Sequence, residues 1–294
     1  MRHRHPLTKM LINLPLLVLV AGCPDLCRGE ASKTENSNAG IHPDMRVSFE
    51  NADRSIGSDF RKGVWRVPSV FKGQFLSWDG LRIFLYSGPF LAISFLEERA
   101  VSDWCRENRI PEDSGADVFL DALGGVVYPI AFIPIYALAR SIKDDRMADL
   151  AVDLTTFTLV CHPELIAVRY IGDRPRPNGE RDFIFGLEAC SSFPSGHTAA
   201  AVGVARLAHY HYGPWVGVPL YLLAAAIGYQ RLGAGEHYLA DVVGGAMLGL
   251  SVADAVVRER RKEREGSEAR KQLSVQPMVG GRHGALGIAV SWDF

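Results

Sequence analysis

A chain of 294 residues with 48% apolar residues can bury one large core. Because no segment repeats at a fixed period, we expect one main domain. The 32 Lys and Arg residues are balanced by 33 Asp and Glu residues, which gives a formal net charge of -1. This balance argues against the basic surface that follows a phosphate backbone, so we expect no nucleic-acid partner.

The N-terminus has the composition of an export signal, and we expect residues 1–22 to be a signal peptide. Basic residues precede a short apolar stretch, Met10–Gly22, which ends in small residues. The end of this stretch, Val20–Cys23, reads VAGC. It resembles the lipobox of bacterial lipoproteins, in which the chain is cut before the cysteine and the cysteine is acylated. We therefore expect lipidation of Cys23, with ordinary signal cleavage nearby as the alternative.

The other cysteines could form disulfides in an oxidising compartment, in any of three pairings. The sequence does not choose among these pairings. No pair has the spacing of a zinc site, so we expect no metal. These residues are Cys27, Cys105, Cys161 and Cys190.

Residues 23–60 are polar with little periodicity, and we expect them to form a tether. Beyond them, long apolar segments alternate with breakers such as IPEDSG (110–115), and strand-like alternation is absent. The pattern predicts an all-α domain over residues 61–258, built as a bundle of about six helices. The apolar segments cover roughly residues 80–98, 117–140, 147–171, 196–211, 214–230 and 238–258.

The chain after the last apolar segment changes character twice. Residues 259–271 are densely charged and are predicted to be a linker or a charged extension of the last helix. In residues 272–294, apolar residues alternate up to Phe294, and GGRHG (280–284) offers a turn. This pattern predicts a small C-terminal β-hairpin.

The stretch SSFPSGHTAA (191–200) places a polar turn directly before an apolar helix. Ser195 is at the expected N-cap, and Gly196 lets the backbone approach a ligand closely. The free N–H groups of the first turn and the helix dipole make such a turn an anion site. The alternative is a plain N-cap with an incidental His197.

The stretch RYIGDRPRP (169–177) carries three guanidinium groups held by two prolines that disfavour helix. Arginine side chains match tetrahedral oxyanions, so Arg169, Arg174 and Arg176 are candidate phosphate ligands. The alternative is a solvated basic loop.

The stretch QRLGAGEHYLAD (230–241) carries His237 and Asp241, four residues apart at the start of the last apolar segment. This spacing places both on one helical face, where the carboxylate can hold one ring nitrogen and leave the other free. The alternative is a surface His-Asp pair. In an up-and-down bundle the connections after the third and fifth helices lie at the same end, so all three stretches, with Arg231, are expected to converge there.

Together the three stretches resemble the signature of the type 2 phosphatidic acid phosphatase and vanadium haloperoxidase superfamily, written K-x6-R-P, P-S-G-H and S-R-x5-H-x3-D. The first part matches at Arg169 and Arg176–Pro177, the second at Pro194–His197, and the third at Gln230–Asp241. Two positions depart from the signature. Arg169 replaces the leading lysine, which keeps the charge but changes the reach, and Gln230 replaces a serine.

The resemblance implies a helical bundle of the acid phosphatase and haloperoxidase type and assigns roles to its residues. His237 is the nucleophile that forms a phosphohistidine, and Asp241 orients it. His197 protonates the departing oxygen and then deprotonates water. The phosphate oxygens are held by Arg169, Arg176, Ser195, Gly196 and Arg231. The resemblance implies no metal and no other cofactor.

The resulting prediction is a metal-independent phosphatase that hydrolyses phosphomonoesters or lipid (pyro)phosphates. Its partner would be a phosphorylated lipid or a small phosphoester. One alternative is a vanadate-dependent haloperoxidase, because a site that holds phosphate also holds vanadate. Another is a lipoprotein that binds a phosphorylated lipid without turnover. A turnover assay with and without chelator separates these functions.

The apolar segments also bear on how the chain meets a membrane. Uncharged runs are long only at Ala122–Ala139 and Tyr212–Gln230, whereas Asp153, Glu164 and Arg206 interrupt the third and fourth segments. Charges of this kind are costly in lipid-facing helices. We therefore expect a periplasm-facing bundle attached to the membrane of the bacterial cell envelope through Cys23, with membrane-spanning helices as the alternative.

Overall fold

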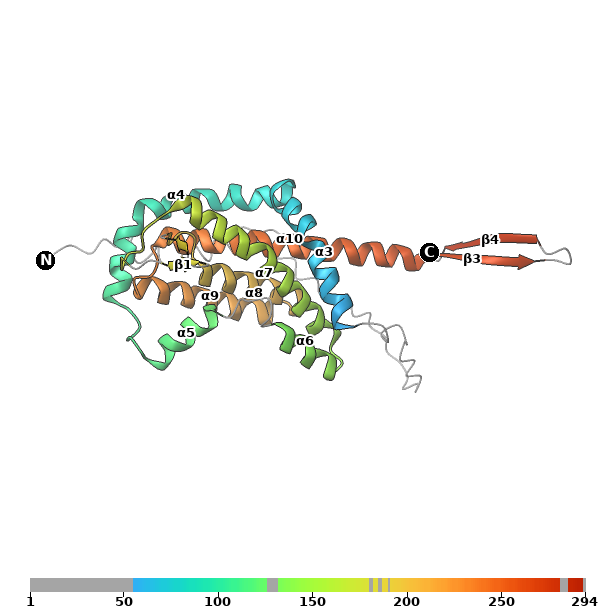
Figure 1. The fold of residues 1–294 in the computed structure, drawn as a ribbon, viewed down its shortest axis with the longest axis horizontal. Helices are drawn as coiled ribbons and strands as arrows, with labels where there is room; N and C mark the ends of the chain where they lie inside the picture. Colours follow the sequence, from blue (N-terminus) through green and yellow to red (C-terminus); the bar gives the residue numbers. More distant parts are fainter. Residues whose placement is uncertain are drawn as a thin grey trace.

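The computed structural model describes residues 55–125, 132–179, 182–184, 187–189, 191–280 and 285–292. The expected signal peptide, Cys23 and almost all of the expected tether lie outside these residues. The main body is helical, as predicted, and eight helices, α3 to α10, are described (Figure 1).

The first described helix, α3 (Ile56–Phe75), was not among the predicted segments, and it begins inside the expected tether. Ser55 caps it by accepting a hydrogen bond from the backbone N–H of Ser58 at 3.2 Å. The sequence pattern missed α3 because several of its buried positions are polar: Asp59, Arg66 and Gln74. The next helix, α4 (Trp78–Glu107), is capped by Ser77, which accepts from the backbone N–H of Gly80 at 3.0 Å.

The segment predicted as one helix over residues 117–140 contains two helices with different partners. α5 (Gly115–Gly125) packs on α8 and α9, whereas α6 (Phe132–Ser141) packs on α7. Residues 126–131 between them lie outside the described part. This division brings α5 over the end of the bundle where the predicted site residues lie.

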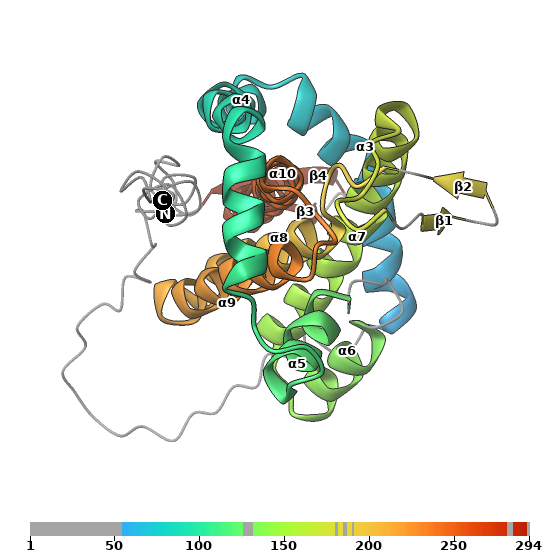
Figure 2. The same ribbon diagram turned by 90° about the vertical axis from the view of Figure 1, so that its left-hand side faces the viewer.

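The centre of the fold is α10 (Leu239–Gln272), which packs against α3, α4, α7 and α8. Figure 2 shows α10 nearly along its axis, with these helices around it. The other core helices are α7 (Asp145–Gly172), α8 (Gly196–Tyr212) and α9 (Pro214–Gly233).

Two glycines set how closely α10 approaches α8. A Cβ atom at Gly245 would lie 2.3 Å from the carbonyl oxygen of Ser195, and one at Gly249 would lie 2.1 Å from that of Ala199. Neither distance is possible, so the close contact requires glycine at both positions. It seats the N-terminus of α8 directly against α10.

α10 continues to Gln272, so residues 259–271 form the charged extension of the last helix, which was one of the two expectations, and not a linker. Beyond it, β3 (Leu273–Gly280) pairs antiparallel with β4 (Ala285–Trp292), with Leu273 opposite Trp292. Figure 1 shows this part of the chain extending away from the helical body. A second, shorter pair, β1 (Asp182–Ile184) and β2 (Leu187–Ala189), lies between α7 and α8 in the sequence.

Within the described part of the chain, two helices are long and apolar enough to cross a membrane, α7 and the Leu239–Ser267 part of α10. In α10, 94% of the most apolar window is buried inside the protein, and in α7 the share is 61%. A buried core helix passes the same test, so this is weak evidence for spanning. Cys105 and Cys161 are buried free thiols, so they do not pair with each other. Cys27 and Cys190, the other two candidates for pairing, lie outside the described residues, as Cys23 does.

Candidate active site

Backbone hydrogen bonds tie the three sequence motifs together at one end of the bundle. The N–H of Ser195, before α8, donates to the carbonyl oxygen of Asp241 at 2.9 Å. The N–H of Ser192 donates to the carbonyl of Arg174 at 2.7 Å, and that of Asn178 donates to the carbonyl of Gly235 at 3.0 Å. Each motif is therefore fixed to another by main-chain bonds, and the side chains of all three converge.

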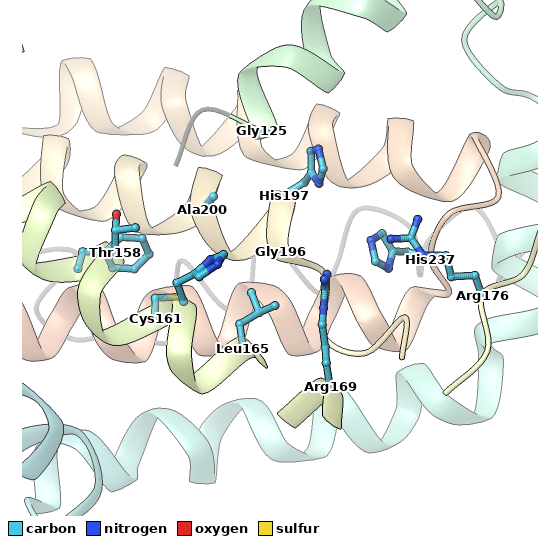
Figure 3. Close-up of a pocket in the computed structure, with 13 residues that line it drawn as sticks. Gly125, Thr158, Cys161, Leu165, Arg169, Arg176, Gly196, His197, Ala200 and His237 are labelled. Atoms are coloured by element: carbon cyan, nitrogen blue, oxygen red, sulfur yellow. The ribbon is translucent and has the colours of Figure 1, made fainter. Parts of the chain in front are cut away.

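A cavity of about 260 Å³ lies at this convergence. Figure 3 shows the side chains of Arg169, His197 and His237 directed into it beside Gly196. Of the predicted site residues, the cavity is lined by Arg169, Arg176, Gly196, His197 and His237. Ser195, Arg231 and Asp241 are buried next to it. The remaining lining residues are Gly124, Gly125, Phe157, Thr158, Cys161, His162, Leu165 and Ala200.

The N-terminus of α8 forms one wall. α8 begins at Gly196 with Ser195 as the N-cap, but the Ser195 side chain makes no capping hydrogen bond to the first turn. Arg169 donates from Nε and Nη2 to the carbonyl oxygen of Pro194, each at 3.3 Å. A Cβ atom at Gly196 would lie 3.4 Å from Nη2 of Arg169. The positive end of the helix and a guanidinium group thus face the same space.

Glu236 links two further arginines at the site. Arg231 Nη2 lies 3.1 Å from Glu236 Oε2, and Arg176 forms an ion pair with the same oxygen. Both guanidinium groups are largely buried, and buried arginines need such partners. A carboxylate therefore fixes the spacing of two of the positive charges that would meet an anion.

His237 and Asp241 form a buried pair. His237 Nδ1 lies 3.6 Å from Asp241 Oδ2, and the His237 side chain is 1% exposed. Burial lowers the pKa of His237 to about 4, although the neighbouring Asp241 carboxylate opposes this shift. His237 is therefore neutral near pH 7, which leaves a nitrogen lone pair for reaction.

Asp241 is held in place from several sides. Arg174 Nη1 donates to its Oδ1 at 2.7 Å, and the backbone N–H of Tyr238 donates to Oδ2 at 2.8 Å. Burial raises the pKa of the Asp241 carboxyl, but its contacts with His237, the Tyr238 N–H and Arg174 outweigh burial and keep the pKa below its usual value. Asp241 is thus a fixed carboxylate behind His237.

Arg174 differs from its predicted role as a phosphate ligand. It does not line the cavity; it bonds Asp241 and also pairs with Glu98 of α4. Its guanidinium group stacks on the ring of Tyr238, 4.4 Å from the centroid. Sequence spacing alone did not separate Arg174 from Arg176, because its partners Glu98 and Asp241 are distant in the chain.

His197 lies on the first turn of α8 at the cavity wall. Burial lowers its pKa to about 4, and the positive charges of Arg231 and Arg169 act in the same direction. A Cβ atom at Gly124 of α5 would lie 2.5 Å from His197 Cδ2, so α5 packs directly on this ring.

α5 also supplies Asp121, which the sequence analysis did not identify. Its carboxylate forms an ion pair with Arg231, and its Oδ1 lies 3.6 Å from His197 Nε2. No motif marks this position, and only the packing of α5 on α8 and α9 brings it to the site. Within the described residues, no group of three or more His, Cys, Asp or Glu residues is placed to hold a metal ion.

Comparison with known proteins gives a family match over the part of the chain that carries the three motifs. Residues 151–265 match the family model described as the PAP2 superfamily. This part of the chain is therefore similar to the PAP2 superfamily. The matched range begins in α7 and ends in α10, so it includes the Arg169, His197 and His237 motifs but not α5.

Two curated relatives are similar over parts of the chain. The lipid A 1-phosphatase of Porphyromonas gingivalis is 37% identical over 91 residues, which are 30% of this chain and 19% of that protein. The lipid A 4'-phosphatase of Helicobacter pylori is 27% identical over 144 residues, which are 47% of this chain and 69% of that protein. The chain thus spans less than two thirds of the first relative's length.

Two solved structures are also similar. The crystal structure of Aquifex aeolicus LpxE is 22% identical, with a TM-score of 0.42, over 55% of this chain and 94% of that one. A transmembrane PAP2 type phosphatidylglycerolphosphate phosphatase from Bacillus subtilis is 20% identical, with a TM-score of 0.47, over 62% of this chain and 96% of that one.

Proposed function

We propose that this protein is a phosphatase of the PAP2 superfamily that hydrolyses phosphate monoesters of lipids through a phosphohistidine intermediate. The observation that carries the proposal is the buried pair of His237 and Asp241, which faces the same cavity as His197 and two arginines. A neutral nucleophile, an orienting carboxylate, a second histidine and several fixed positive charges are the groups that this reaction needs.

Substrate phosphate would bind between Arg169, Arg176 and the first turn of α8. The guanidinium groups and the backbone N–H groups of that turn hold the non-bridging oxygens. Arg231 lies behind them, paired with Glu236 and Asp121. Because these groups stabilise the charge that develops on the oxygens, they supply the function that a metal ion performs in other phosphatases.

In the first step, the free ring nitrogen of His237 attacks phosphorus. A nitrogen-phosphorus bond forms, the bond to the leaving oxygen breaks, and His197 transfers its proton to that oxygen. Asp241 stabilises the positive charge that develops on the His237 ring, as carboxylates do in other His-Asp pairs.

In the second step, water hydrolyses the phosphohistidine. His197, now neutral, takes a proton from water as the water oxygen attacks phosphorus. The nitrogen-phosphorus bond breaks, inorganic phosphate leaves, and both histidines return to their starting states. One histidine therefore serves as acid and then as base, while the other is the nucleophile.

Two observations support a lipid substrate. Both curated relatives are named as lipid A phosphatases. The cavity of about 260 Å³ is smaller than the roughly 300–1,000 Å³ of typical ligand pockets. A cavity of this size has room for a phosphate group and a few adjoining atoms, and the rest of a large substrate would lie outside it.

Exposed apolar side chains support an association with the membrane. Many large apolar residues of α3, α4 and the short turn between them are solvent-exposed, among them Trp65, Leu76, Trp78, Leu85, Tyr86 and Leu96. Exposed apolar surface of this extent is typical of protein or membrane contact. We infer that the protein works at the membrane of the cell envelope, facing the periplasm. Attachment through lipidated Cys23 is part of this proposal.

We also infer that the functional unit is a bundle over roughly residues 61–258, of the acid phosphatase and haloperoxidase type. The C-terminal hairpin of residues 272–294 would then be a separate appendage. Activity of a chain that ends after residue 272 would support this division.

The proposal is tested by measuring phosphate release from lipid A, phosphatidate and an aryl phosphate with purified full-length protein. We expect release from lipid substrates in the presence of chelator. Vanadate should inhibit, because as a pentacoordinate species it mimics phosphorus in the transition state. Complete loss of activity in chelator, or no release from any of the three substrates, would contradict the proposal.

A further inference from the structure

The proposed reaction requires His197 to be protonated, but most of the groups around the ring disfavour its protonated form. To protonate the leaving group, the ring must carry a proton when the ester bond breaks. Burial, together with Arg231, His237 and Arg169, lowers the pKa of His197 to about 4, against the opposing effect of Asp121. Most of the structure around His197 therefore favours the neutral ring.

The groups that face His197 come from four parts of the fold. α9 contributes Arg231, α7 contributes Arg169, the segment before α10 contributes His237, and α5 contributes Asp121. Among these described neighbours, Asp121 is the only one that carries a negative charge. Its Oδ1 lies 3.6 Å from His197 Nε2.

We propose that Asp121 is a positioning residue of the active site, whose carboxylate favours the protonated form of His197 and holds Arg231 beside it. This inference rests on the proposed function and concerns the step in which the leaving group departs. Asp121 neither gains nor loses a proton. The proton moves from His197 to the leaving oxygen, and the carboxylate stabilises the imidazolium until that transfer.

The geometry fits this role better than a purely structural one. The same oxygen, Oδ1, contacts both Arg231 Nη1 and His197 Nε2, so one atom joins the phosphate cradle to the proton donor. The Asp121 side chain is 53% exposed, and ion pairs with an exposed partner contribute little to the stability of a fold. Gly124, one turn later, fixes the distance by packing against the His197 ring.

α5 contains a matched control. Asp117 lies one turn before Asp121 and accepts a hydrogen bond from Gln230 Nε2 at 2.9 Å. It therefore joins α5 to α9, as Asp121 does, but it contacts Gln230 rather than His197. Replacing Asp117 tests the docking of α5 without removing the charge beside the imidazole.

The experiment compares Asp121→Asn, Asp121→Glu and Asp117→Asn in the full chain, with an alkyl and an aryl phosphate over a range of pH. A general acid loses its proton as pH rises, so it sets the basic limb of the kcat profile. We expect Asp121→Asn to move that limb to lower pH by about half a unit to one unit. At a fixed pH on that limb, alkyl turnover should fall roughly 3- to 10-fold more than aryl turnover, because a phenolate leaves without a proton.

Asp121→Glu keeps the carboxylate and should restore part of the shift. Asp117→Asn should change alkyl and aryl turnover by the same factor and leave the limb in place. If Asp121→Asn behaves in that same way, the inference is wrong and Asp121 serves only to dock α5. If the unmodified protein hydrolyses neither substrate, the proposed function fails together with the inference.

Discussion

The backbone N–H of Ser195 donates a hydrogen bond to the carbonyl oxygen of Asp241 at 2.9 Å. This bond joins the N-terminus of α8 to the first turn of α10. It sets the position of His197, two residues after Ser195, relative to His237, four residues before Asp241. The two histidines of the proposed reaction are thus related by main-chain geometry and not by side-chain contacts alone.

Arg174→Lys should weaken catalysis through Asp241. Lysine keeps the charge but loses the planar group that bonds Asp241 and Glu98 and stacks on Tyr238. We expect kcat to fall roughly tenfold, about 1.4 kcal/mol of transition-state stabilisation, with little change in KM. Steady-state kinetics with an aryl phosphate measure this. A rise in KM at constant kcat would show instead that Arg174 binds substrate phosphate.

Gly124→Ala should displace His197. The added Cβ atom would meet the ring at 2.5 Å, so either the ring or α5 must move. A displacement of about 1 Å in a reacting group can lower the rate roughly 100-fold, and the loss should be larger for alkyl than for aryl phosphates. Gly115→Ala, on the same helix, is the control, because nothing lies within 4 Å of its added Cβ atom. Equal losses in both variants would contradict the assigned contact.

Asp153→Ala should destabilise the protein without a specific effect on the site. Asp153 is fully buried in the half of α7 away from Arg169 and contacts Arg66 at 2.9 Å, His211 at 2.9 Å and Arg260 at 2.6 Å. Removing one member of a buried ion cluster costs about 3–5 kcal/mol. Denaturant unfolding measures the loss. A variant as stable as the unmodified protein would show that the cluster contributes little.

Acid should destabilise the folded protein through His237. Because burial lowers its folded pKa to about 4, below the ordinary value of 6.5, the unfolded state takes up a proton first as pH falls. The free energy of unfolding should therefore decrease between about pH 6.5 and 4, by at most about 1.4 kcal/mol per pH unit for this group. In His237→Asn, the free energy of unfolding should depend less steeply on pH over this range, because about one proton fewer is taken up on unfolding. An unchanged dependence would mean that His237 is protonated in the folded state.

The grouping of the site residues at one end of the bundle was predictable because their motifs are local. The spacing of His237 and Asp241 and the polar turn before α8 can be read along the chain. α3 was missed, however, because Arg66 and Asp59 are buried by partners far away in the sequence. The separate roles of Arg174 and Asp121 were missed for the same reason. Arg174 pairs with Glu98, and Asp121 pairs with Arg231, which is 110 residues away in the sequence. Sequence periodicity also could not divide residues 117–140 into α5 and α6, because both helices are apolar.

The central claim is that His237 is the nucleophile and His197 the proton donor. The most direct test is to measure the phosphoenzyme formed from an aryl phosphate in His237→Ala and His197→Ala, with turnover of an alkyl phosphate measured in parallel. His237→Ala should form no phosphoenzyme from either substrate. His197→Ala should still form it from the aryl phosphate while losing roughly 100- to 10,000-fold on the alkyl phosphate. A phosphoenzyme that persists in His237→Ala and disappears in His197→Ala would contradict the account, because that result exchanges the two roles.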